Sequence, residues 1–416
     1  MTENDRVPLT LISGLSPGPA LRLADLLHHA DRATAVVHYD LRQVERGIVH
    51  RRLRLGPRDQ LTALELGHGC VSCTLREDLL PLLRRLSGMP QVRRIAVHLD
   101  EAMEPEPVCW ALEHVLVGDR PVSTDVEIDA VVTVLDRTTW LDDATGDDTL
   151  ADRGLRASPD DERTLAQVAL SQVEFADVLV LAGAAPDAWH AARTGAVLDR
   201  VAPTAALVEL TGLDPAGLRA AVPAGARRGT LVDPHGPLLA GQPPLHADCG
   251  IAVLTFTERR PFHPERLHDA LDVLLDGVVR TRGRAWVASR PDTALWLESA
   301  GGGLGIGNAG PWLDSPGGPA WEDVSPERRA LASLRWDPVF GDRAQELVVV
   351  THQAAPAEIE AALRGALLTD AELAEGRTAW RAYPDPFGEW HTEPCEDTED
   401  RQHPGVSVNQ GRDERP

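Results

Sequence analysis

The chain has 416 residues, more than one hydrophobic core usually organises, so we expect two domains. Hydrophobic residues make up 43% and charged residues 25%, a balance that excludes wholesale disorder. The net charge of −23 repels a phosphate backbone, so it disfavours direct nucleic-acid binding and favours a basic protein partner or a cation. The sequence contains no lysine, and all 41 basic residues are arginines. Every mechanism that needs a lysine ammonium group is therefore excluded.

The N-terminal segment and the cysteines indicate the compartment. Two acids and one arginine precede a short apolar run in MTENDRVPLTLISGL, and Asp25 interrupts the chain before a secretory signal could form. No run of eighteen apolar residues occurs, so we predict neither a membrane span nor a membrane partner. Five cysteines are too few and too unevenly spaced for a disulfide framework. We predict a cytoplasmic protein with reduced thiols.

Residues 1–212 alternate short β-branched runs with amphipathic stretches, as in a parallel sheet covered by helices. Helical spacing of apolar residues is clear in 79–86, 109–115 and 165–175. We therefore predict a doubly wound α/β domain with a mostly parallel sheet. Its predicted strands are 7–12, 35–38, 95–99, 130–135, 178–181 and 206–210.

Residues 213–249 lose this periodicity and become rich in glycine, proline and alanine, which predicts an inter-domain linker. A smaller α+β domain is expected over residues 250–390, and seven of the ten tryptophans, from Trp286 to Trp390, should build its core. Residues 391–416 are acidic and almost without apolar residues, so we predict a disordered tail. The predicted strands of the second domain are 251–256, 284–289, 294–299, 304–308 and 346–351, and its predicted helices are 263–275 and 359–368.

Motifs in both predicted domains have counterparts in one known family. The segment GHGCVSCTLREDLLPLLRRL (67–86) resembles the cysteine motif and following helix of the CobW family of GTPases. The segments RRPFHPERLHDAL, RTRGRAWVASRPD, GDRAQELVVV and AYPDPFGEW resemble successive blocks of its C-terminal domain, so the resemblance covers residues 7–390. It implies a P-loop G domain, a CobW C-terminal domain, and a role in supplying zinc, cobalt or another metal to client proteins.

The phosphate-binding segment implied by this resemblance, SGLSPGPALRL, departs from the family pattern. A P-loop needs a row of backbone N–H groups, a lysine on the terminal phosphates and a hydroxyl on Mg²⁺. With Gly14 as the first glycine, Pro19 replaces the second, Ala20 replaces the lysine and Leu21 replaces the hydroxyl residue. Pro17 and Pro19 also remove two N–H donors from the loop. A P-loop of this composition predicts that GTP is not held in the usual way.

Gly14, Ser16 and Gly18 remain as candidate nucleotide contacts of this degenerate P-loop. The family recognises guanine with an Asn-Lys-x-Asp run after a strand, whereas here the predicted strand 178–181 is followed by Ala-Gly-Ala-Ala. The aspartate that would accept from the base is missing. Together with the altered P-loop, this loss predicts that the chain does not hydrolyse GTP.

A third departure follows the strand segment RRIAV (93–97), where the resemblance implies a Glu-Thr/Ser-Gly run near the γ-phosphate. This chain has His98, Asp100 and Glu101 there, and extra carboxylates would repel phosphate. The three residues form either a polar loop at a strand end or part of a ligand site, because the carboxyl edge of a parallel sheet is where α/β proteins bind ligands. Metal-assisted hydrolysis by this cluster is the weakest of the functional hypotheses.

The cysteine motif is altered as well. Family members carry Cys-x-Cys-Cys, whose thiolates suit Zn²⁺ or Cu(I), whereas this chain has Cys70 and Cys73 with Ser72 between them. A closed zinc site needs four ligands, so His68 is the third candidate and His98 or a water is the fourth. The alternative is that small residues simply fit a tight turn before a helix at 76–86.

Other polar clusters carry weaker signals. His246 and Cys249 have a spacing typical of metal ligands, which we interpret as coincidence. We interpret the histidines and the cysteine of the tail as solvated residues. Arginines alternate, as on a strand face, in RRLRL (51–55) and RTRGR (280–284). We interpret both stripes as local salt-bridge partners rather than as phosphate or RNA contacts.

The functional prediction combines these losses with the resemblance. Within the family, GHGCVSCT, the missing P-loop lysine and LLDGVVRTRGR resemble an actinobacterial branch made under zinc scarcity, whose members are implicated in recruiting a hibernation-promoting factor to ribosomes. The resemblance implies a non-catalytic adaptor or zinc sensor whose acidic surface faces a basic ribosome-associated protein. The alternative is a GTP-dependent zinc metallochaperone of the ordinary family type.

Overall fold

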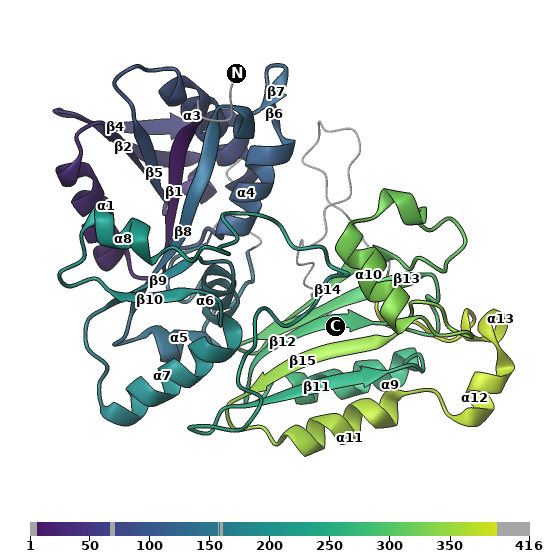
Figure 1. Cartoon of the computed structure of the whole chain (residues 1–416). Coiled ribbons are helices and arrows are strands. Elements are labelled where there is room, and N and C mark those ends of the chain that lie inside the picture. Colours follow the sequence, from purple (N-terminus) through teal and green to yellow (C-terminus); the bar gives the residue numbers. More distant parts are fainter. Residues whose placement is uncertain (1–5, 67–70, 157, 159–160, 389–416) are drawn as a thin grey trace. The chain divides into compact units, whose positions relative to one another are not determined.

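The computed structural model describes residues 6–66, 71–156, 158 and 161–388. The chain divides into two compact units, with the boundary between Leu231 and Val232 (Figure 1). His68, Cys70 and the segment 391–416 lie outside the described residues. No helix in the described part of the chain is long and apolar enough to cross a membrane.

The first unit is built on an eight-stranded sheet with strand order β10-β9-β8-β1-β5-β2-β3-β4. The six strands from β10 to β2 pair in parallel, and β3 and β4 extend the edge antiparallel. The predicted doubly wound, mostly parallel α/β fold is confirmed. The strands are β1 (Val7–Ser13), β2 (Thr34–Asp40), β3 (Ile48–Leu55), β4 (Arg58–Glu65), β5 (Arg94–His98), β8 (Val126–Asp136), β9 (Val178–Ala182) and β10 (Ala206–Glu209).

Helices cover both faces of this sheet because its central strands are apolar on both sides. Leu9 and Leu11 of β1 pack with α3 and α4, whereas Ile12 packs with α1 and α8 on the other face. A two-stranded hairpin, β6 (Leu116–Val117) and β7 (Arg120–Pro121), follows α4. The helices are α1 (Pro17–Ala30), α2 (Val71–Thr74), α3 (Leu80–Ser87), α4 (Pro105–His114), α5 (Trp140–Thr145), α6 (Leu165–Glu174), α7 (Ala188–Val201) and α8 (Pro215–Ala221).

The predicted linker, residues 213–249, contains both a helix and the unit boundary. Helix α8 occupies Pro215–Ala221, where the prediction has no helix, and its Leu218 packs into the core beside α1. Asp214 caps α8 by accepting from the Gly217 N–H, at 2.6 Å. One leucine is enough to anchor two turns of helix, so the periodicity that signals longer helices is missing here.

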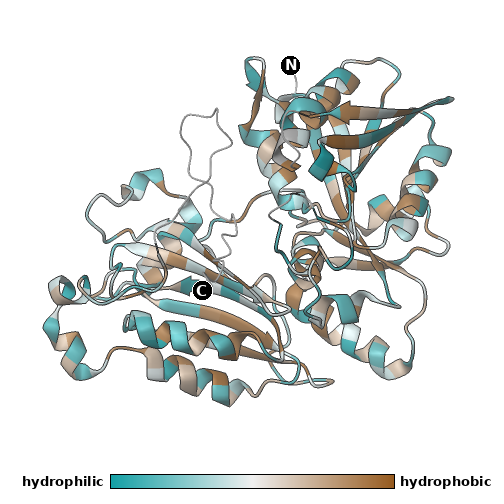
Figure 2. Cartoon of the chain, turned by 180° about the vertical axis from the view of Figure 1, so that it is seen from behind, coloured by the Kyte–Doolittle hydropathy of each residue, from teal (hydrophilic) through white to brown (hydrophobic). Residues whose placement is uncertain are grey.

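The second unit holds a five-stranded antiparallel sheet with order β11-β15-β12-β13-β14. Helices α9 and α11 pack against one of its faces. Buried Trp286, Trp312 and Trp380 form a separate cluster, as the tryptophan-rich composition predicts. In Figure 2, hydrophobic residues follow the strands of both sheets, in agreement with these cores. The elements are β11 (Ala252–Glu258), β12 (Val278–Ala285), β13 (Thr293–Ala300), β14 (Gly303–Pro311), β15 (Gln345–Thr351), α9 (Pro264–Ala270), α10 (Pro326–Arg335), α11 (Pro356–Ala366), α12 (Asp370–Glu375) and α13 (Arg377–Trp380).

The predicted strand at 284–289 is wrong in its position. Strand β12 spans Val278–Ala285, and Trp286 to Ala288 instead bond to Phe262. The apolar run around Trp286 suggested a strand, whereas the real strand carries alternating arginines. Arg280 and Arg284 are buried there because Glu298 and Glu346 pair with them.

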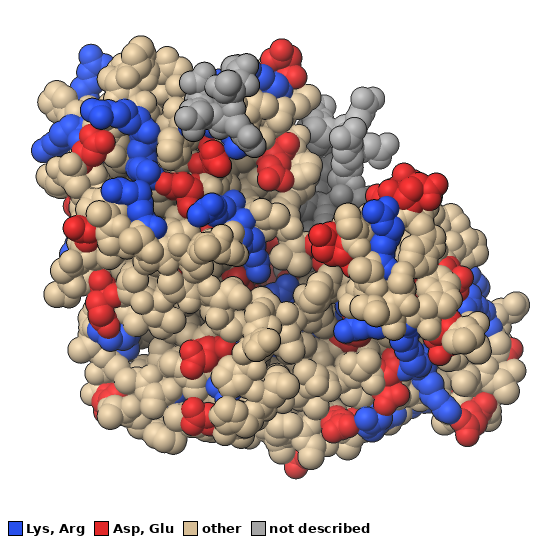
Figure 3. All heavy atoms as spheres, in the orientation of Figure 1, with Lys and Arg blue, Asp and Glu red and all other residues tan. Residues whose placement is uncertain are grey.

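The interpretation of the arginine stripes as salt-bridge partners is confirmed. Arg51 pairs with Asp78, and Arg54 pairs with Asp25 of α1. Such pairs let strand β3 join the sheet, although the prediction has no strand there. Figure 3 shows positive and negative side chains intermixed on the visible face, as local pairing requires.

Gly283 in β12 offers a test of strand packing in the second unit. A Cβ atom at Gly283 would lie 2.0 Å from the backbone oxygen of Glu346, so Gly283→Ala must push β12 away from β15. We expect the variant to lose about 1–3 kcal/mol of unfolding free energy. Chemical denaturation followed by tryptophan fluorescence measures it.

Gly365→Ala in α11 is the matched control, since a Cβ atom there meets nothing within 4 Å. This change should be neutral or stabilise by up to about 1 kcal/mol. Equal denaturation midpoints for the two variants would show that the β12–β15 contact does not constrain position 283.

Candidate functional site

The connection between β1 and α1 follows the path of a phosphate-binding loop. Gly14 has a φ of +146°, and a Cβ atom there would lie 2.3 Å from the backbone oxygen of Val134 in β8. Glycine is therefore required for the chain to pass this strand. Ser16 follows as the N-cap of α1, without a side-chain capping bond.

The first turn of α1 does not fit a bound nucleoside triphosphate. The two prolines lie in this turn rather than in the preceding loop, with Pro17 at the first position. Of the first three helical residues, Gly18 alone keeps an N–H, because proline has none. The next N–H, of Ala20, points back to the Ser16 oxygen at 3.5 Å. Ala20, at the lysine position, is fully buried in the core, so no cation faces a phosphate there.

The edge that would recognise guanine is closed by hydrogen bonds within the chain. Gly183, directly after β9, has a φ of +69° and lies against the Asp136 carboxylate. Arg137 donates to the Gly183 oxygen at 2.6 Å and forms two bonds, each 2.9 Å long, with the Glu209 carboxylate. These contacts join the carboxyl ends of β8, β9 and β10. Arg137 was not singled out by sequence, because its partners are distant along the chain.

Two histidines lie at the carboxyl ends of neighbouring parallel strands. His98, the last residue of β5, is opposite His38 of β2 in the strand register, and their rings stack with centroids 4.3 Å apart. Burial, then the charges of His38 and Arg54, lower the pKa of His98 to about 3. Burial also lowers the pKa of His38. Both rings are therefore neutral at pH 7. The sequence signal for His38 was its place at the end of a predicted strand.

Asp100 and Glu101 after β5 are engaged in structural contacts. Asp100 accepts hydrogen bonds from the N–H groups of Leu41, at 2.7 Å, and Ala102, at 3.0 Å. Burial and the neighbouring Glu101 raise the pKa of Asp100 well above its usual range. Arg42 pairs with Glu101 at 3.0 Å. These bonds favour the polar-loop interpretation over a hydrolytic site.

The segment after the cysteine motif is helical from Val71 onward. It passes from α2 through a π-helix, η2 (Leu75–Leu79), into α3, in agreement with the predicted helix at 76–86. Asp78 of η2 accepts from the Tyr39 hydroxyl at 2.6 Å and pairs with Arg51. The helix that carries the cysteine motif is thus fixed to strands β2 and β3.

The proposed zinc ligands cannot be compared side by side, since His68 and Cys70 fall outside the described residues and the side chain of Cys73 is not described. Within the described part of the chain, no three His, Cys, Asp or Glu side chains are grouped as a metal site would require. Cys109 is buried in the core, where burial raises its thiol pKa, and Cys249 lies half-buried with a φ of +50°.

His98 predicts a pH dependence of stability. Its folded pKa is about 3, below the unfolded value of 6.5, so its stabilising effect is present above pH 6.5 and is lost as the pH falls toward 3. From pH 7 to pH 5 this loss amounts to about 2 kcal/mol. In His98→Phe, which keeps a ring against His38, denaturation midpoints should vary less over this range. An unchanged pH profile would mean that the pKa of His98 is the same in the folded and unfolded protein.

Comparisons with family models agree with this architecture. A model described as CobW/HypB/UreG, nucleotide-binding domain, matches residues 18–208. A second model, described as the cobalamin synthesis protein cobW C-terminal domain, matches residues 251–367. Together they span more than half of the chain.

Similar proteins were also found among curated sequences and solved structures. A Mycobacterium tuberculosis protein named as a zinc chaperone is 48% identical over 345 residues, covering 81% of this chain and 82% of its own. The zinc-regulated GTPase metalloprotein activator 1 of Dictyostelium discoideum is 27% identical over 412 residues, covering 92% and 84%. The Zn(II)-bound YjiA GTPase structure from E. coli, with 14% identity and a TM-score of 0.38, covers 87% of this chain and 99% of that one. The chain belongs to the CobW family of G3E P-loop GTPases.

Proposed function

We propose that this protein acts in zinc homeostasis as a non-hydrolysing member of its family, an adaptor that recruits a ribosome hibernation factor when zinc is scarce. The composition of the first turn of α1 supports the part of this proposal that concerns GTP, namely that the protein does not hydrolyse it. Pro17 and Pro19 remove N–H donors there, and buried Ala20 replaces the phosphate-binding cation. A nucleotide phosphate would meet neither the donors nor the charge that it needs.

The names of the relatives support the link to zinc. One is called a zinc chaperone and another a zinc-regulated metalloprotein activator. In this chain Cys70 and Cys73 are the thiolate candidates, with His68 and His98 as further ligands, and zinc would be cargo or signal rather than a catalytic group. Because η2 is bonded to β2 and β3, a metal bound just before it would act on a segment fixed to the sheet.

Charge supports a basic protein partner in the cytoplasm. The chain carries 64 acidic and 41 basic residues, so a basic protein approaches it under long-range attraction, whereas bare RNA is repelled. A hibernation-promoting factor bound to the ribosome fits this description. The proposal therefore places contact with a ribosome-associated protein ahead of direct contact with nucleic acid.

A second candidate function is that of a GTP-dependent zinc metallochaperone. The family assignment and the name of the Dictyostelium relative favour it. It requires a phosphate site unlike the usual one, because the chain has no lysine and its P-loop position is a buried alanine.

Nucleotide binding separates the two candidates. We expect fluorescent GTP with Mg²⁺ to show no saturable binding at micromolar protein, and denaturation of freshly purified protein to release no guanine nucleotide. The physical reason is the loss of N–H donors at Pro17 and Pro19. Saturable micromolar binding, or one GDP per chain, would instead favour the metallochaperone.

Zinc content and partner capture test the adaptor. In Cys70→Ser with Cys73→Ser, we expect zinc per chain to fall by at least half and capture of the hibernation-promoting factor with ribosomes to change by severalfold. Cys249→Ser is the matched control, since it removes a thiol outside the motif and should change neither quantity.

The dependence of partner capture on ionic strength is a further test of the adaptor. Capture of the factor and ribosomes should weaken as the salt concentration rises, because ions screen the attraction between the acidic surface and a basic partner. If neither the factor nor ribosomes are captured at low ionic strength, where steering is strongest, the adaptor proposal fails even though the zinc result could stand.

A further inference from the structure

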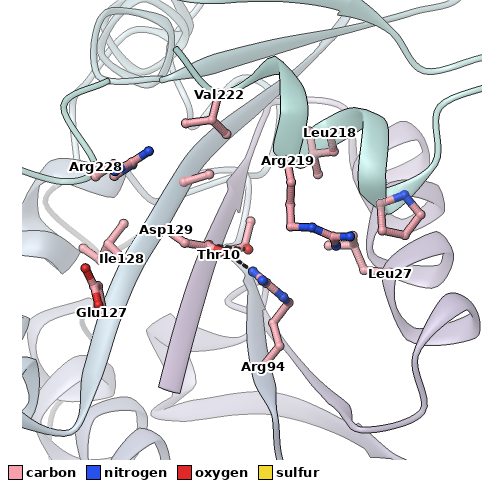
Figure 4. A pocket seen from close by; sticks show the side chains of 12 residues that line it. Thr10, Leu27, Arg94, Glu127, Ile128, Asp129, Leu218, Arg219, Val222 and Arg228 are labelled. Carbon is pink, nitrogen blue, oxygen red and sulfur yellow. Dashed lines mark hydrogen bonds and ion pairs between the residues drawn. The ribbon is translucent and has the colours of Figure 1, made fainter. Parts of the chain in front are cut away.

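A pocket of about 210 Å³ lies in the first unit, away from the degenerate nucleotide cleft. Thr10, Arg94 and Asp129 contribute to it from the amino-terminal halves of β1, β5 and β8. Nucleotide clefts in parallel sheets lie at the carboxyl ends of the strands, so this is the opposite edge. Helix α8 and the end of α1 complete the walls (Figure 4).

A β-bulge places a carboxylate in the pocket. Leu9 pairs with Ile128 and Thr10 pairs with Ala130, so Asp129 is the extra residue of β8. Bulges re-aim side chains in this way. The Asp129 carboxylate accepts from the Thr10 hydroxyl at 2.8 Å and also pairs with Arg94. Asp129 is therefore already occupied and leaves the remaining N–H groups of Arg94 free to take another acceptor.

Arg219 brings a second guanidinium to the same place. It extends from α8 toward Leu27 and the Arg94 side of the pocket (Figure 4). Within the described residues, its guanidinium makes no hydrogen bond or ion pair. Arg94 and Arg219 line the same pocket, and burial, followed by the charge of Arg219, lowers the pKa of Arg94. An anion between them would replace this repulsion with attraction.

The remaining lining adds positive charge and an apolar wall. Arg228 lies across β8 from Arg219, and Glu127 is paired with Arg6 at 3.3 Å. The pocket thus has three arginines and two carboxylates, both of which already have partners. The apolar wall consists of Leu27, Ile128, Ala130, Pro215, Leu218 and Val222. The volume of the whole pocket is below the roughly 300–1,000 Å³ of ordinary ligand pockets, so the ligand must be small.

We propose that this pocket binds a small organic acid, with its carboxylate between Arg219 and Arg94 and its hydrocarbon part against Leu218 and Val222. Guanidinium groups bind carboxylates through paired N–H donors, which explains why two arginines converge on one wall. The apolar wall selects against inorganic anions, which have nothing to bury there. The inference is independent of zinc, of GTP and of the ribosome.

Hexanoate labelled with ¹³C at its carboxyl carbon is a suitable probe, followed by NMR titration of the full chain. Hexanamide, which has the same shape without the charge, and inorganic phosphate are the comparison ligands. We expect saturable binding of hexanoate, no binding of hexanamide, and no displacement by equimolar phosphate.

Arg219→Gln should weaken hexanoate binding at least tenfold, and because Arg219 is exposed, the variant should fold with an unchanged melting temperature. Arg85→Gln is the matched control, since it removes an exposed arginine from α3 on the other face of the sheet and should leave affinity unchanged. The proposal is overturned if hexanoate does not saturate, if both variants weaken it equally, or if hexanamide binds as well. Displacement by equimolar phosphate would overturn the organic-acid class in favour of an inorganic anion.

Discussion

The close approach of Gly14 to β8 determines where the connection from β1 to α1 turns. Because the backbone passes within contact of Val134, the chain must turn there and enter α1 immediately. Proline suits the first turn of a helix, where an N–H has no partner within the helix. The sequence can therefore lose its phosphate chemistry and keep the same path of the chain. Fold and nucleotide binding depend on different atoms of one loop.

The same separation appears along the carboxyl edge of the sheet. At this edge Arg137 donates to Gly183 and Glu209, and the Asp100 carboxylate accepts from the N–H groups of Leu41 and Ala102, so these polar groups are bonded within the chain. The His38 and His98 rings stack on each other at the ends of β2 and β5. Each of the hydrogen bonds of Arg137 and Asp100 stabilises the unit while occupying a group that a ligand could use. The carboxyl edge of the sheet is therefore held together by bonds within the chain.

Strands that are apolar on both faces could be predicted from the sequence, whereas strands that carry buried arginines could not. Strands β1, β5, β8 and β9 follow from β-branched runs, since a parallel sheet buries both faces. Strands β3 and β12 carry buried arginines whose carboxylate partners lie far along the chain, so no local pattern reveals their burial. The His38–His98 stack depends on strand register and was equally hidden. The P-loop losses were visible because they concern residue types at fixed spacing.

A chain of net charge −23 can still contain a cationic pocket, because charge acts locally when it is partly buried. Most arginines of the chain meet a carboxylate, as Arg51 and Arg284 do. At the amino-terminal edge of the parallel sheet, the β-bulge commits Asp129 to Arg94 and leaves Arg219 facing the same space. Among the described residues no carboxylate pairs with Arg219, so the excess of acids elsewhere leaves this cation available. The two edges of the sheet therefore differ: at the carboxyl edge Arg137 and Asp100 are bonded within the chain, whereas at the amino-terminal edge Arg219 has no described partner.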